Sequence, residues 1–341
     1  MPGINVGIDL GSSCITVFVA GKGIVMSEAT AISYDTYSRE VVAVGNSAKE
    51  MLERCPSTIE VSMPIKSGII ADFPVMKQIL SFVVEKVCKN KVFRPNLIIS
   101  APSSITALQK RTIIDVSCAC GAGKVCLIAE SVASALGAGI DIDYPHGVMV
   151  VDIGAGTCDI AVITMGTVAF SASVDTAGDS IDEAIIRYIR KEKNIVIGKS
   201  TAEKIKKKIG CASNRDEEIE MSVNGKEAIT LMPVTFTVTS TEICTCLAET
   251  VDLIFEGIKS VLEQTPPELY RDICSEGITL SGGSSHLYGL DKILSEKLKI
   301  EVRACADGEH SAAKGAGYAL RNIDKLEDNG YIFRIRERRE D

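Results

Sequence analysis

Short apolar runs along the chain alternate with longer segments in which apolar residues recur every three or four positions. The short runs predict buried strands, and the longer segments predict amphipathic helices. The expected strands lie at 4–10, 15–25, 96–102, 124–130, within 147–174 (three strands) and at the start of 277–290. The expected helices lie at 74–87, 105–122, 131–139, 178–194 and 240–262, the last with Ser240 as its N-cap. This order of elements predicts an α/β protein.

Two polar stretches interrupt the pattern. Residues 34–64 carry one short expected helix around Ala48–Arg54, and residues 195–234 contain the lysine-rich segment STAEKIKKKIG. Each stretch lies within an apolar part that begins with a strand, an aspartate and a glycine-rich turn. The sequence therefore predicts two α/β halves, each carrying a small inserted lobe.

Composition agrees with a globular protein of two domains. The 341 residues are 46% hydrophobic and 24% charged, which is typical of folded chains too long for one small core. The net charge of −8 argues against a broad nucleic-acid surface, because phosphate binding needs clustered cations. The N-terminus has no apolar signal core, and no segment reaches the ~18 apolar residues of a membrane span, so we expect a cytoplasmic chain.

The twelve cysteines are expected to stay reduced in such a compartment. Cys118/Cys120 and Cys244/Cys246 form CxC pairs, no CxxC occurs, and the three histidines lie far apart. Metal ligation by cysteine competes with a role as small buried hydrophobes, and the spacing favours the latter.

One short motif occurs twice. GIDLGSSC at 7–14 returns as VDIGAGTC at 151–158, and the two aspartates are 143 positions apart (152 − 9). A hairpin rich in glycine and serine exposes backbone N–H groups that bind phosphate oxygens, and a Cβ would block that approach. Two facing hairpins could hold a polyphosphate from both sides.

The aspartates need a separate explanation, because a carboxylate beside a phosphate repels it. A divalent cation between them, typically Mg²⁺ with its retained waters, removes the conflict. A single Asp-x-Gly is more often a turn cap. Two copies, each opening an α/β half, together with a third glycine turn at Ser281-Gly282-Gly283, instead favour one nucleotide site built from two halves.

These motifs resemble, in the same order, the phosphate-1, phosphate-2 and adenosine motifs of the actin, DnaK-type chaperone and sugar-kinase superfamily. Within it the chain is identified as a member of the bacterial actin family, the MreB/Mbl rod-shape proteins, from residue 4 to about 325. The segments that carry the resemblance are GIDLGSS, GKGIV, AVGNSAKEML, PIKSGIIADF, LIAESVASALGAGIDI, VMVVDIGAGTCDIAVI, AGDSIDEAIIRYIRKEKNIVIGKSTAEKIKKKIG, VLEQTPPEL and GITLSGGSSHLYGLD.

The resemblance implies the actin-like ATPase fold, with two duplicated ribonuclease H-like α/β halves, each with an inserted subdomain, and a nucleotide cleft between them. Its four subdomains would divide the chain into 1–33, 65–140 and 309–325 (subdomain IA), 34–64 (IB), 141–180 and 235–308 (IIA), 181–234 (IIB) and a tail at 326–341.

The resemblance also implies roles for particular residues. Glu130 and Asp152 would be catalytic, with Glu130 orienting the attacking water, and Asp9 and Asp152 would hold Mg²⁺ through water. The expected nucleotide contacts are Asp9, Gly11, Ser12, Ser13 and Cys14; Gly154, Ala155, Gly156 and Thr157; Gly178 and Asp179; Glu203 and Lys206; and Gly282, Gly283 and Ser284. Without the resemblance, Glu203 and Lys206 would be interpreted as a solvated pair one helical turn apart.

Three positions depart from the family pattern. The first loop reads Gly11-Ser12-Ser13-Cys14-Ile15 in place of Gly-Thr-Ala-Asn-Thr, the second has Ala155 in place of glycine, and Ser131 replaces the proline after the catalytic glutamate. The acids remain, so we expect nucleotide binding to persist. Hydrolysis stays open between a slow ATPase and a non-hydrolysing structural paralogue, because a misplaced water costs orders of magnitude in rate.

Two surface segments suggest contacts outside the nucleotide site. Val92 and Phe93 lie among Lys89, Lys91 and Arg94 and match a membrane-insertion loop of some bacterial actins, although Phe93 could instead fold back onto the core. The tail at 329–341 alternates apolar and charged residues, and we interpret it as a frayed, solvated terminus.

The resulting functional hypothesis is a membrane-associated cytoskeletal protein. It would bind ATP, or GTP as the alternative nucleotide, with Mg²⁺, polymerise with itself, and lie on the anionic inner face of the cell membrane. There it would organise the cell-wall elongation machinery of a rod-shaped cell, without binding nucleic acid. A small-molecule kinase is disfavoured by the short inserts, and a chaperone by the lack of a substrate-domain-sized segment after residue 325.

Overall fold

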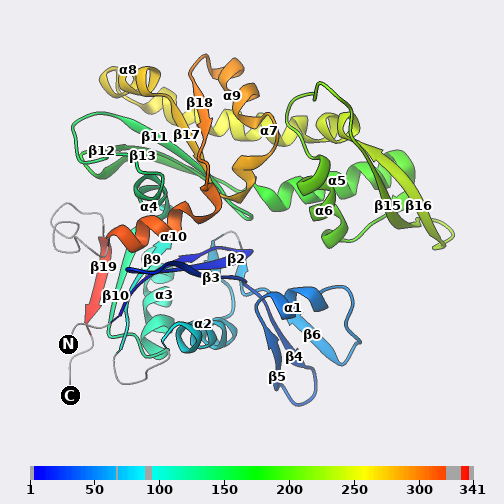
Figure 1. The fold of residues 1–341 in the computed structure, drawn as a ribbon, viewed down its shortest axis with the longest axis horizontal. Helices are drawn as coiled ribbons and strands as arrows, with labels where there is room; N and C mark the ends of the chain where they lie inside the picture. Colours follow the sequence, from blue (N-terminus) through cyan, green and yellow to red (C-terminus); the bar gives the residue numbers. More distant parts are fainter. Residues whose placement is uncertain (1–3, 67, 89–93, 320–331, 338–341) are drawn as a thin grey trace.

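The computed structural model describes residues 4–66, 68–88, 94–319 and 332–337. Its centre is formed by two mixed sheets that lie in separate halves of the molecule (Figure 1). One sheet has six strands in the order β19-β10-β9-β1-β2-β3, and the other has five in the order β13-β12-β11-β17-β18. The prediction of an α/β fold with two halves is confirmed.

The first half begins with the β1–β2 hairpin, and β1 pairs in parallel with β9 on its other side. The strands are β1 (Asn5–Leu10), β2 (Cys14–Val19), β3 (Gly23–Ala29), β9 (Asn96–Ala101), β10 (Lys124–Ala129) and β19 (Ile332–Glu337), with a short β7 (Ile65–Lys66) and β8 (Ile69–Ile70) pair nearby. The helices are α2 (Phe73–Val87), α3 (Ala107–Ala119), α4 (Glu130–Gly137) and α10 (Gly308–Ala319). On α2, the buried residues Val75, Met76, Ile79, Leu80 and Val83 follow the predicted helical spacing.

The second half repeats this plan. The β11–β12 hairpin is antiparallel, and β11 pairs in parallel with β17. The strands are β11 (Val148–Ile153), β12 (Cys158–Thr164), β13 (Thr167–Val174), β17 (Ile278–Ser281) and β18 (Val302–Ala304), and the helices are α7 (Ser240–Gln264), α8 (Pro267–Glu276), the 3₁₀ turn η1 (Gly283–His286) and α9 (Leu290–Leu298). The duplication seen in the sequence is therefore a duplication of topology.

Two small lobes extend from the same side of the halves (Figure 1). The first lobe holds α1 (Asn46–Met51) and the sheet of β4 (Ile32–Asp35), β5 (Val41–Val44) and β6 (Ile59–Ser62). The second lobe holds α5 (Gly178–Lys193), α6 (Lys199–Ile209) and the sheet of β14 (Ile195–Val196), β15 (Glu220–Glu227) and β16 (Pro233–Thr239). Each polar insert of the sequence thus forms part of a lobe with its own short strands.

The halves join where α4 and α10 cross. Helix α10 packs on β1 and β9, whereas α4 packs on β11 and β12. A Cβ on Gly315 would overlap the carbonyl oxygen of Ala133, and one on Gly137 would overlap that of Ser311. Glycine at these two positions lets the helix backbones touch, and this contact fixes the spacing between the two sheets.

The N-cap of α7 is Thr239 and not the predicted Ser240. The Thr239 hydroxyl accepts a hydrogen bond from the backbone N–H of Glu242 (3.3 Å), and the Glu242 carboxylate accepts one from the N–H of Thr239 (2.9 Å). The glutamate three residues after Thr239 completes a capping box, which decides between two adjacent candidates. Ser240 is the first helical residue, and its hydroxyl accepts a hydrogen bond from the N–H of Ile219 (3.0 Å).

The interpretation of the tail as frayed is wrong for residues 332–337, which form β19 antiparallel to β10 at the edge of the first sheet. Their alternation of apolar and charged residues is the period-2 pattern that is typical of strands. The remaining tail positions, and the membrane-loop residues Val92 and Phe93, lie outside the described residues. In the part of the chain that the structure describes, no helix is both long enough and apolar enough to span a membrane.

Candidate functional site

A cavity of about 500 Å³ lies between the two halves. It brings together most of the residues that the sequence singled out: Asp9, Gly11, Ser12, Ser13, Cys14, Glu130, Asp152, Gly154, Ala155, Gly178, Glu203, Lys206, Gly282, Gly283 and Ser284. Gly156, Thr157 and Asp179 are not among the residues lining it. The sequence did not single out Thr16, Ile181, Lys207, Gly210, Arg215, His286, Leu287, Tyr288, Gly308, Glu309 or Ala312, which also line this cavity.

The two predicted phosphate loops have the same local geometry. In the first hairpin, the Gly11 N–H donates to the carbonyl oxygen of Cys14 (3.1 Å), and in the second the Gly154 N–H donates to that of Thr157 (3.0 Å). Both hairpins therefore close with the same turn, 143 residues apart (154 − 11). In each hairpin an aspartate stands two residues before the glycine of this turn, and both the aspartate and the glycine line the cavity.

A serine accompanies each aspartate on the neighbouring parallel strand. Ser100 on β9 lies at the register position of Asp9, and its hydroxyl donates to Asp9 Oδ1 (2.7 Å). Ser281 on β17 lies at the register position of Asp152, and its hydrogen bond lowers the pKa of that carboxyl. The Ser134 hydroxyl also donates to Asp152 Oδ2. The sequence analysis did not predict a role for Ser100, although it lies one residue before the end of β9, much as Ser281 ends β17.

The acids in the cavity repel one another. Burial raises the pKa of Asp9 to about 6, against the hydrogen bond from Ser100 and the charge of His310. Burial and the charges of Asp9 and Asp159 raise the pKa of Asp152 to about 7. The pKa of Glu130 is raised well above its ordinary value by burial and by Asp152, Asp9 and Asp159. A cation among these carboxylates would relieve the repulsion.

This donor set fits a hydrated magnesium ion. Hard carboxylate oxygens suit Mg²⁺, which keeps several waters and takes one or two protein carboxylates together with phosphate oxygens. In the described residues, no group of three or more His, Cys, Asp or Glu side chains could hold a metal by itself. Asp9 and Asp152 are thus positioned to bind a metal only together with water and a bound phosphate.

Backbone contacts fix the second phosphate loop against its neighbours. The Gly178 N–H donates to the carbonyl oxygen of Gly154 (3.1 Å), and the Ser284 hydroxyl donates to the same oxygen (2.7 Å). Gly282 has a φ of +82°, and a Cβ there would overlap the Ile153 carbonyl. The three glycine-rich segments are therefore held against each other by close backbone approach, which leaves little room for side chains at Gly178 and Gly282.

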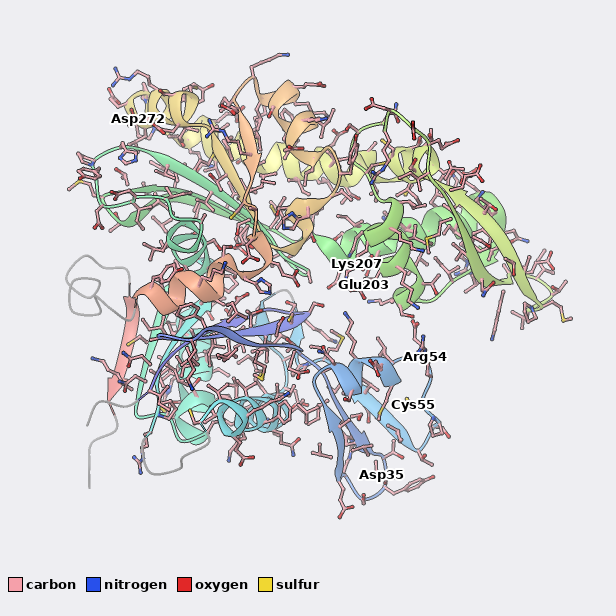
Figure 2. All side chains as sticks on the ribbon, in the orientation of Figure 1. Asp35, Arg54, Cys55, Glu203, Lys207 and Asp272 are labelled. Atoms are coloured by element: carbon pink, nitrogen blue, oxygen red, sulfur yellow. The ribbon has the colours of Figure 1, made fainter. Side chains whose placement is uncertain are left out.

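Glu203 and Lys206 do not form the solvated pair considered from the sequence. Lys206 Nζ donates to Asp182 Oδ2 and to the carbonyl oxygen of Gly178, both at 2.9 Å. Glu203 Oε1 instead lies 3.2 Å from Lys49 Nζ and 2.9 Å from Lys207 Nζ. Against the effect of burial, these two lysines lower the pKa of Glu203. Figure 2 shows Glu203 and Lys207 on α6, above the first lobe.

The two small lobes meet through two residues of the first lobe, Lys49 on α1 and Glu53 in the turn after it. Besides the ion pair between Lys49 and Glu203, Glu53 Oε1 accepts a hydrogen bond from the Lys199 N–H (2.9 Å) and Glu53 Oε2 one from the Ser200 hydroxyl (3.3 Å). Glu53 thus occupies the N-terminus of α6, where a negative charge is favoured. We call Lys49, Glu53, Glu203, Lys199 and Ser200 the interlobe clasp.

The far end of the cavity is partly apolar. Arg215 places its guanidinium 4.0 Å from the centre of the Tyr288 ring, and Leu287 and Ile181 line the same space. The Arg215 side chain also donates to the carbonyl oxygen of Gly210 (3.2 Å). A guanidinium held over a tyrosine ring offers a planar, delocalised surface suited to an aromatic base.

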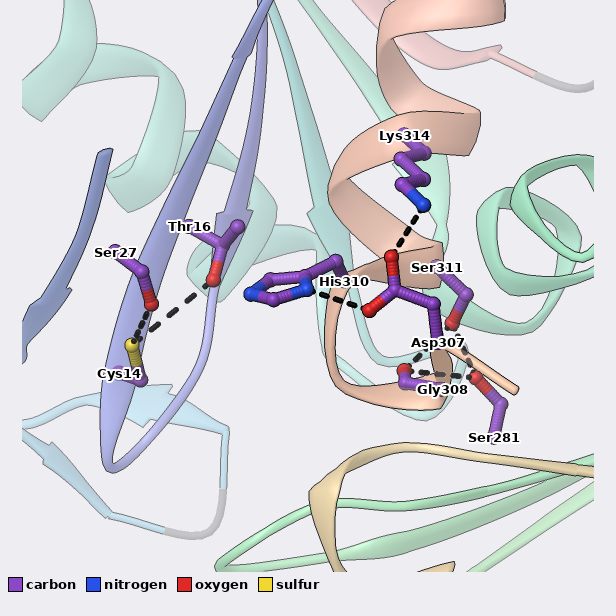
Figure 3. A network of polar contacts seen from close by, with 9 residues as sticks. All are labelled: Cys14, Thr16, Ser27, Ser281, Asp307, Gly308, His310, Ser311 and Lys314. Carbon is purple, nitrogen blue, oxygen red and sulfur yellow. Dashed lines mark hydrogen bonds and ion pairs between the residues drawn. The ribbon is translucent and has the colours of Figure 1, made fainter. Parts of the chain in front are cut away.

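Two groups of polar side chains lie near each other, one at the start of α10 and one on the first hairpin. His310 Nδ1 lies 2.6 Å from Asp307 Oδ1, and Lys314 pairs with the other oxygen of that carboxylate. Figure 3 shows the His310 ring between Asp307 and strand β2, which carries Cys14 and Thr16. Cys14 Sγ lies 3.1 Å from the Ser27 hydroxyl, and burial raises the pKa of the Cys14 thiol. Cys14 is therefore a neutral hydrogen-bonding group and not a nucleophile.

The sequence can now be compared with known proteins. Residues 3–328 match the family model described as MreB/Mbl protein. The chain belongs to the MreB/Mbl family. Two relatives in this family are the cell shape-determining protein Mbl of Bacillus subtilis and the cell shape-determining protein MreB of Escherichia coli, each 40% identical. The match covers 94% of this chain in both cases, with 97% of the Mbl relative and 94% of the MreB relative.

Solved structures agree with this membership and with the actin-like fold. MreB5 of Spiroplasma citri bound to AMPPNP has a TM-score of 0.92 and 30% identity, over 97% of this chain and 99% of that chain. The ADP-bound form of MreB5 also has a TM-score of 0.92, over 96% and 99% of the two chains. The double helical filament of MamK, at 21% identity, has a TM-score of 0.81 over 93% and 98% and shares the fold. The MreB/Mbl family and the actin-like ATPase fold predicted from the sequence are both confirmed.

Proposed function

We propose that the cavity binds ATP with Mg²⁺ and that this chain is a nucleotide-dependent cytoskeletal protein of the MreB/Mbl family. The observation that carries the proposal is the pair of matched hairpins, each with a buried aspartate, that line one cavity from opposite halves. The similarity to MreB5 structures bound to AMPPNP and to ADP supports it.

The phosphates would bind between the two turns. The backbone N–H groups of Ser12, Ser13 and Ala155 belong to the glycine-rich loops that line the cavity, and such concave N–H arrays bind phosphate oxygens. Asp9 and Asp152 would hold the metal through water, and a bound Mg²⁺ supplies charge neutralisation for the terminal phosphates. Thr157 does not line the cavity, and its side chain hydrogen-bonds Asp159. Its contribution to phosphate binding would therefore be indirect.

The adenosine would occupy the other end of the cavity. Glu203 and Lys206 line it from α6, and Gly282, Gly283 and Ser284 line it from the β17–η1 turn. Because Lys206 is bound by Asp182 and Glu203 by Lys49 and Lys207, both side chains are held in place before any ligand arrives. The Arg215–Tyr288 pair would lie along the base.

Glu130 is the residue best suited to orient an attacking water. It lines the cavity together with Asp152 and Asp9, and its raised pKa brings it closer to the working pH of a general base. We therefore propose slow ATP hydrolysis. The alternative, a structural paralogue that binds ATP without turnover, is favoured by the altered positions Ser131 and Ala155.

The cellular part of the proposal rests on family membership. The relatives named cell shape-determining proteins support a role in rod shape through filaments that organise cell-wall synthesis on the inner face of the membrane. Filaments of one chain require head-to-tail contacts that do not close into a ring. Contact with anionic lipid through Val92 and Phe93 is part of this proposal.

Binding and turnover can be tested separately. Calorimetric titration of ATP, with and without Mg²⁺ and in competition with GTP, should give Mg²⁺-dependent binding that Asp152→Ala removes. Phosphate release above the Asp152→Ala background would establish hydrolysis, and its absence with binding intact would establish the non-hydrolysing alternative. No binding by the wild-type chain would overturn the nucleotide site itself.

Polymerisation needs its own assay. Sedimentation with ATP, ADP or no nucleotide, in the presence of vesicles of anionic or neutral lipid, should show ATP-dependent pelleting that is greatest on anionic vesicles. Val92→Ser/Phe93→Ser should remove the vesicle dependence while leaving ATP binding unchanged. Failure to pellet under every condition would contradict the cytoskeletal role.

A further inference from the structure

A second and smaller cavity, of about 150 Å³, shares no lining residue with the first. Three parts of the chain form it: the loop after β9, the first turn of α4, and the adjacent strands β12 and β13. Its lining residues are Ser103, Ser104, Ser131, Asp159, Ile160, Ser171, Ala172 and Ser173. Five of the eight are serines and one is an acid, so oxygen is the dominant chemistry of this cavity.

Two buried oxygens of these residues have no hydrogen-bond partner. They are Asp159 Oδ1 and Ser131 Oγ, on residues that are 4% and 1% exposed. Buried polar atoms are nearly always hydrogen-bonded, because leaving one unpaired loses the bonds that it would make to water. Both residues line the same cavity although they come from different elements, so one occupant can satisfy both oxygens.

The charge around Asp159 indicates what kind of occupant fits. Side-chain hydrogen bonds from Thr157 and Ser173 act on its carboxyl, and the neighbouring charge that acts on it is that of Asp175, another acid. Asp159 in turn raises the pKa of both Glu130 and Asp152. Burial raises the pKa of the Asp159 carboxyl, against the hydrogen bonds from Thr157 and Ser173. Its ionised form therefore needs a compensating positive charge, which a water molecule would not supply.

We propose that the second cavity binds a hydrated monovalent cation of potassium or ammonium size, held by the Asp159 carboxylate and the Ser131 hydroxyl. One carboxylate balances a single positive charge, and the remaining ligands would be neutral hydroxyls and water. Mg²⁺ fits less well, because it demands near-ideal octahedral geometry and binds where carboxylates or phosphates supply more charge. The volume leaves space for the ion and a few waters, each of which takes about 30 Å³.

Because Ser131 directly follows Glu130, an ion in the second cavity would lie next to the residue proposed to orient water and would offset the repulsion that Asp159 exerts on it. The binding proposal itself does not depend on nucleotide binding.

Rubidium provides the probe, because its anomalous scattering identifies it in a crystal. Crystals of the nucleotide-free protein grown with RbCl should show an anomalous peak in the second cavity. In solution, the nucleotide-free protein should unfold at a temperature about 2 °C higher in 150 mM RbCl than in 150 mM choline chloride, since a ligand that binds only the folded state stabilises it.

Two variants and a matched control test the assignment. Asp159→Asn should abolish the rubidium-dependent shift, and Ser131→Ala, which keeps the carboxylate, should reduce it at least by half. Asp216→Asn removes the same charge from an exposed residue that does not line the cavity, and it should keep the shift. Should Asp159→Asn fail to fold, Ser131→Ala and the wild-type crystals decide the question. An anomalous map without a peak, together with equal unfolding temperatures in the two salts, would overturn the proposal.

Discussion

Lys49 of the first lobe donates a 3.2 Å hydrogen bond to Glu203 of the second lobe, although the two residues are 154 positions apart in the chain. Both side chains are about one-quarter to one-third exposed (32% and 25%). Glu203 lines the larger cavity and Lys49 does not. The position of the lobes is thus linked directly to the wall of the proposed nucleotide site.

Removing this bridge should speed ligand release more than it changes stability. Lys49→Ala deletes a partly exposed ion pair, which is worth on the order of 1 kcal/mol or less. We expect a fluorescent ATP analogue to dissociate about two- to fivefold faster in stopped-flow measurements. Lys259→Ala, which removes an ion pair within α7, is the control and should leave the rate unchanged. Equal rates in wild type and Lys49→Ala would show that the clasp does not control release.

The glycine turn at the end of β17 offers a sharp pair of substitutions. A Cβ at Gly282 would overlap the Ile153 carbonyl, and the substituted residue would have to keep a φ of +82°. A Cβ at Gly283 would meet nothing within 4 Å. Gly282→Ala should therefore cost about 1–3 kcal/mol in unfolding free energy and weaken ATP binding strongly. Gly283→Ala should change stability by less than about 1 kcal/mol. Urea unfolding of both variants measures the difference, and similar losses would contradict the proposed close approach.

The raised pKa values predict how stability depends on pH. The pKa of Asp9 is about 6 and that of Asp152 about 7 in the folded state, against about 3.9 for aspartate in an unfolded chain. Between pH 4 and 7 the folded protein therefore holds more protons than the unfolded chain, so these acids make stability fall as pH rises. One such group contributes at most about 1.4 kcal/mol per pH unit.

Asp152→Asn tests this dependence, because its side chain stays neutral. In nucleotide-free protein, urea unfolding from pH 5 to 8 should give a shallower fall in stability for the variant than for wild type. Adding Mg²⁺ and ATP should reverse the wild-type trend, since the metal competes with protons for the same carboxylates. Parallel pH profiles for wild type and variant would show that Asp152 is already ionised in the folded state.

The Ser100 hydroxyl should tune the affinity for Mg²⁺ and ATP through Asp9. Its 2.7 Å hydrogen bond stabilises the ionised carboxylate, and bonds to charged groups contribute about 1.5–3 kcal/mol. In Ser100→Ala, half-maximal binding of Mg²⁺ and ATP should move to higher pH. Ser284→Ala, whose hydroxyl bonds the Gly154 backbone and not a carboxylate, is the control and should leave that pH unchanged. A shift of the same size in both variants would contradict the role of Ser100.

The sequence allowed the duplicated part of the fold to be predicted, because that part is encoded locally. The repeated motif gives a repeated register, because in each hairpin the aspartate lies opposite the residue seven positions later, Asp9 opposite Thr16 and Asp152 opposite Asp159. Turn glycines, buried strand runs and helical spacing each act over a few residues, so their effects can be recognised in a single chain.

The partners of charged residues could not be predicted in the same way. Glu203 and Lys206 are neighbours on a helix, but each pairs with a residue from another element, Lys49 and Asp182 respectively. The partner of each charged side chain depends on how the lobes pack, and a local sequence pattern does not determine that packing. Strand β19 was not predicted for a different reason. Its period-2 pattern is present in the sequence, but segments near a chain end are often frayed, and only the pairing with β10 distinguishes the two outcomes.

The contact of Gly315 with Ala133 has a mechanical consequence. Where two helix backbones touch without intervening side chains, sliding would force carbonyl oxygens through neighbouring atoms, but a small turn about the point of contact would not. The crossing therefore acts as a pivot. Because the lobe tips lie far from it, a rotation about the crossing moves them further than it moves the residues beside the two helices. A rotation of a few degrees at the pivot becomes a displacement large enough to make or break the bond between Lys49 and Glu203.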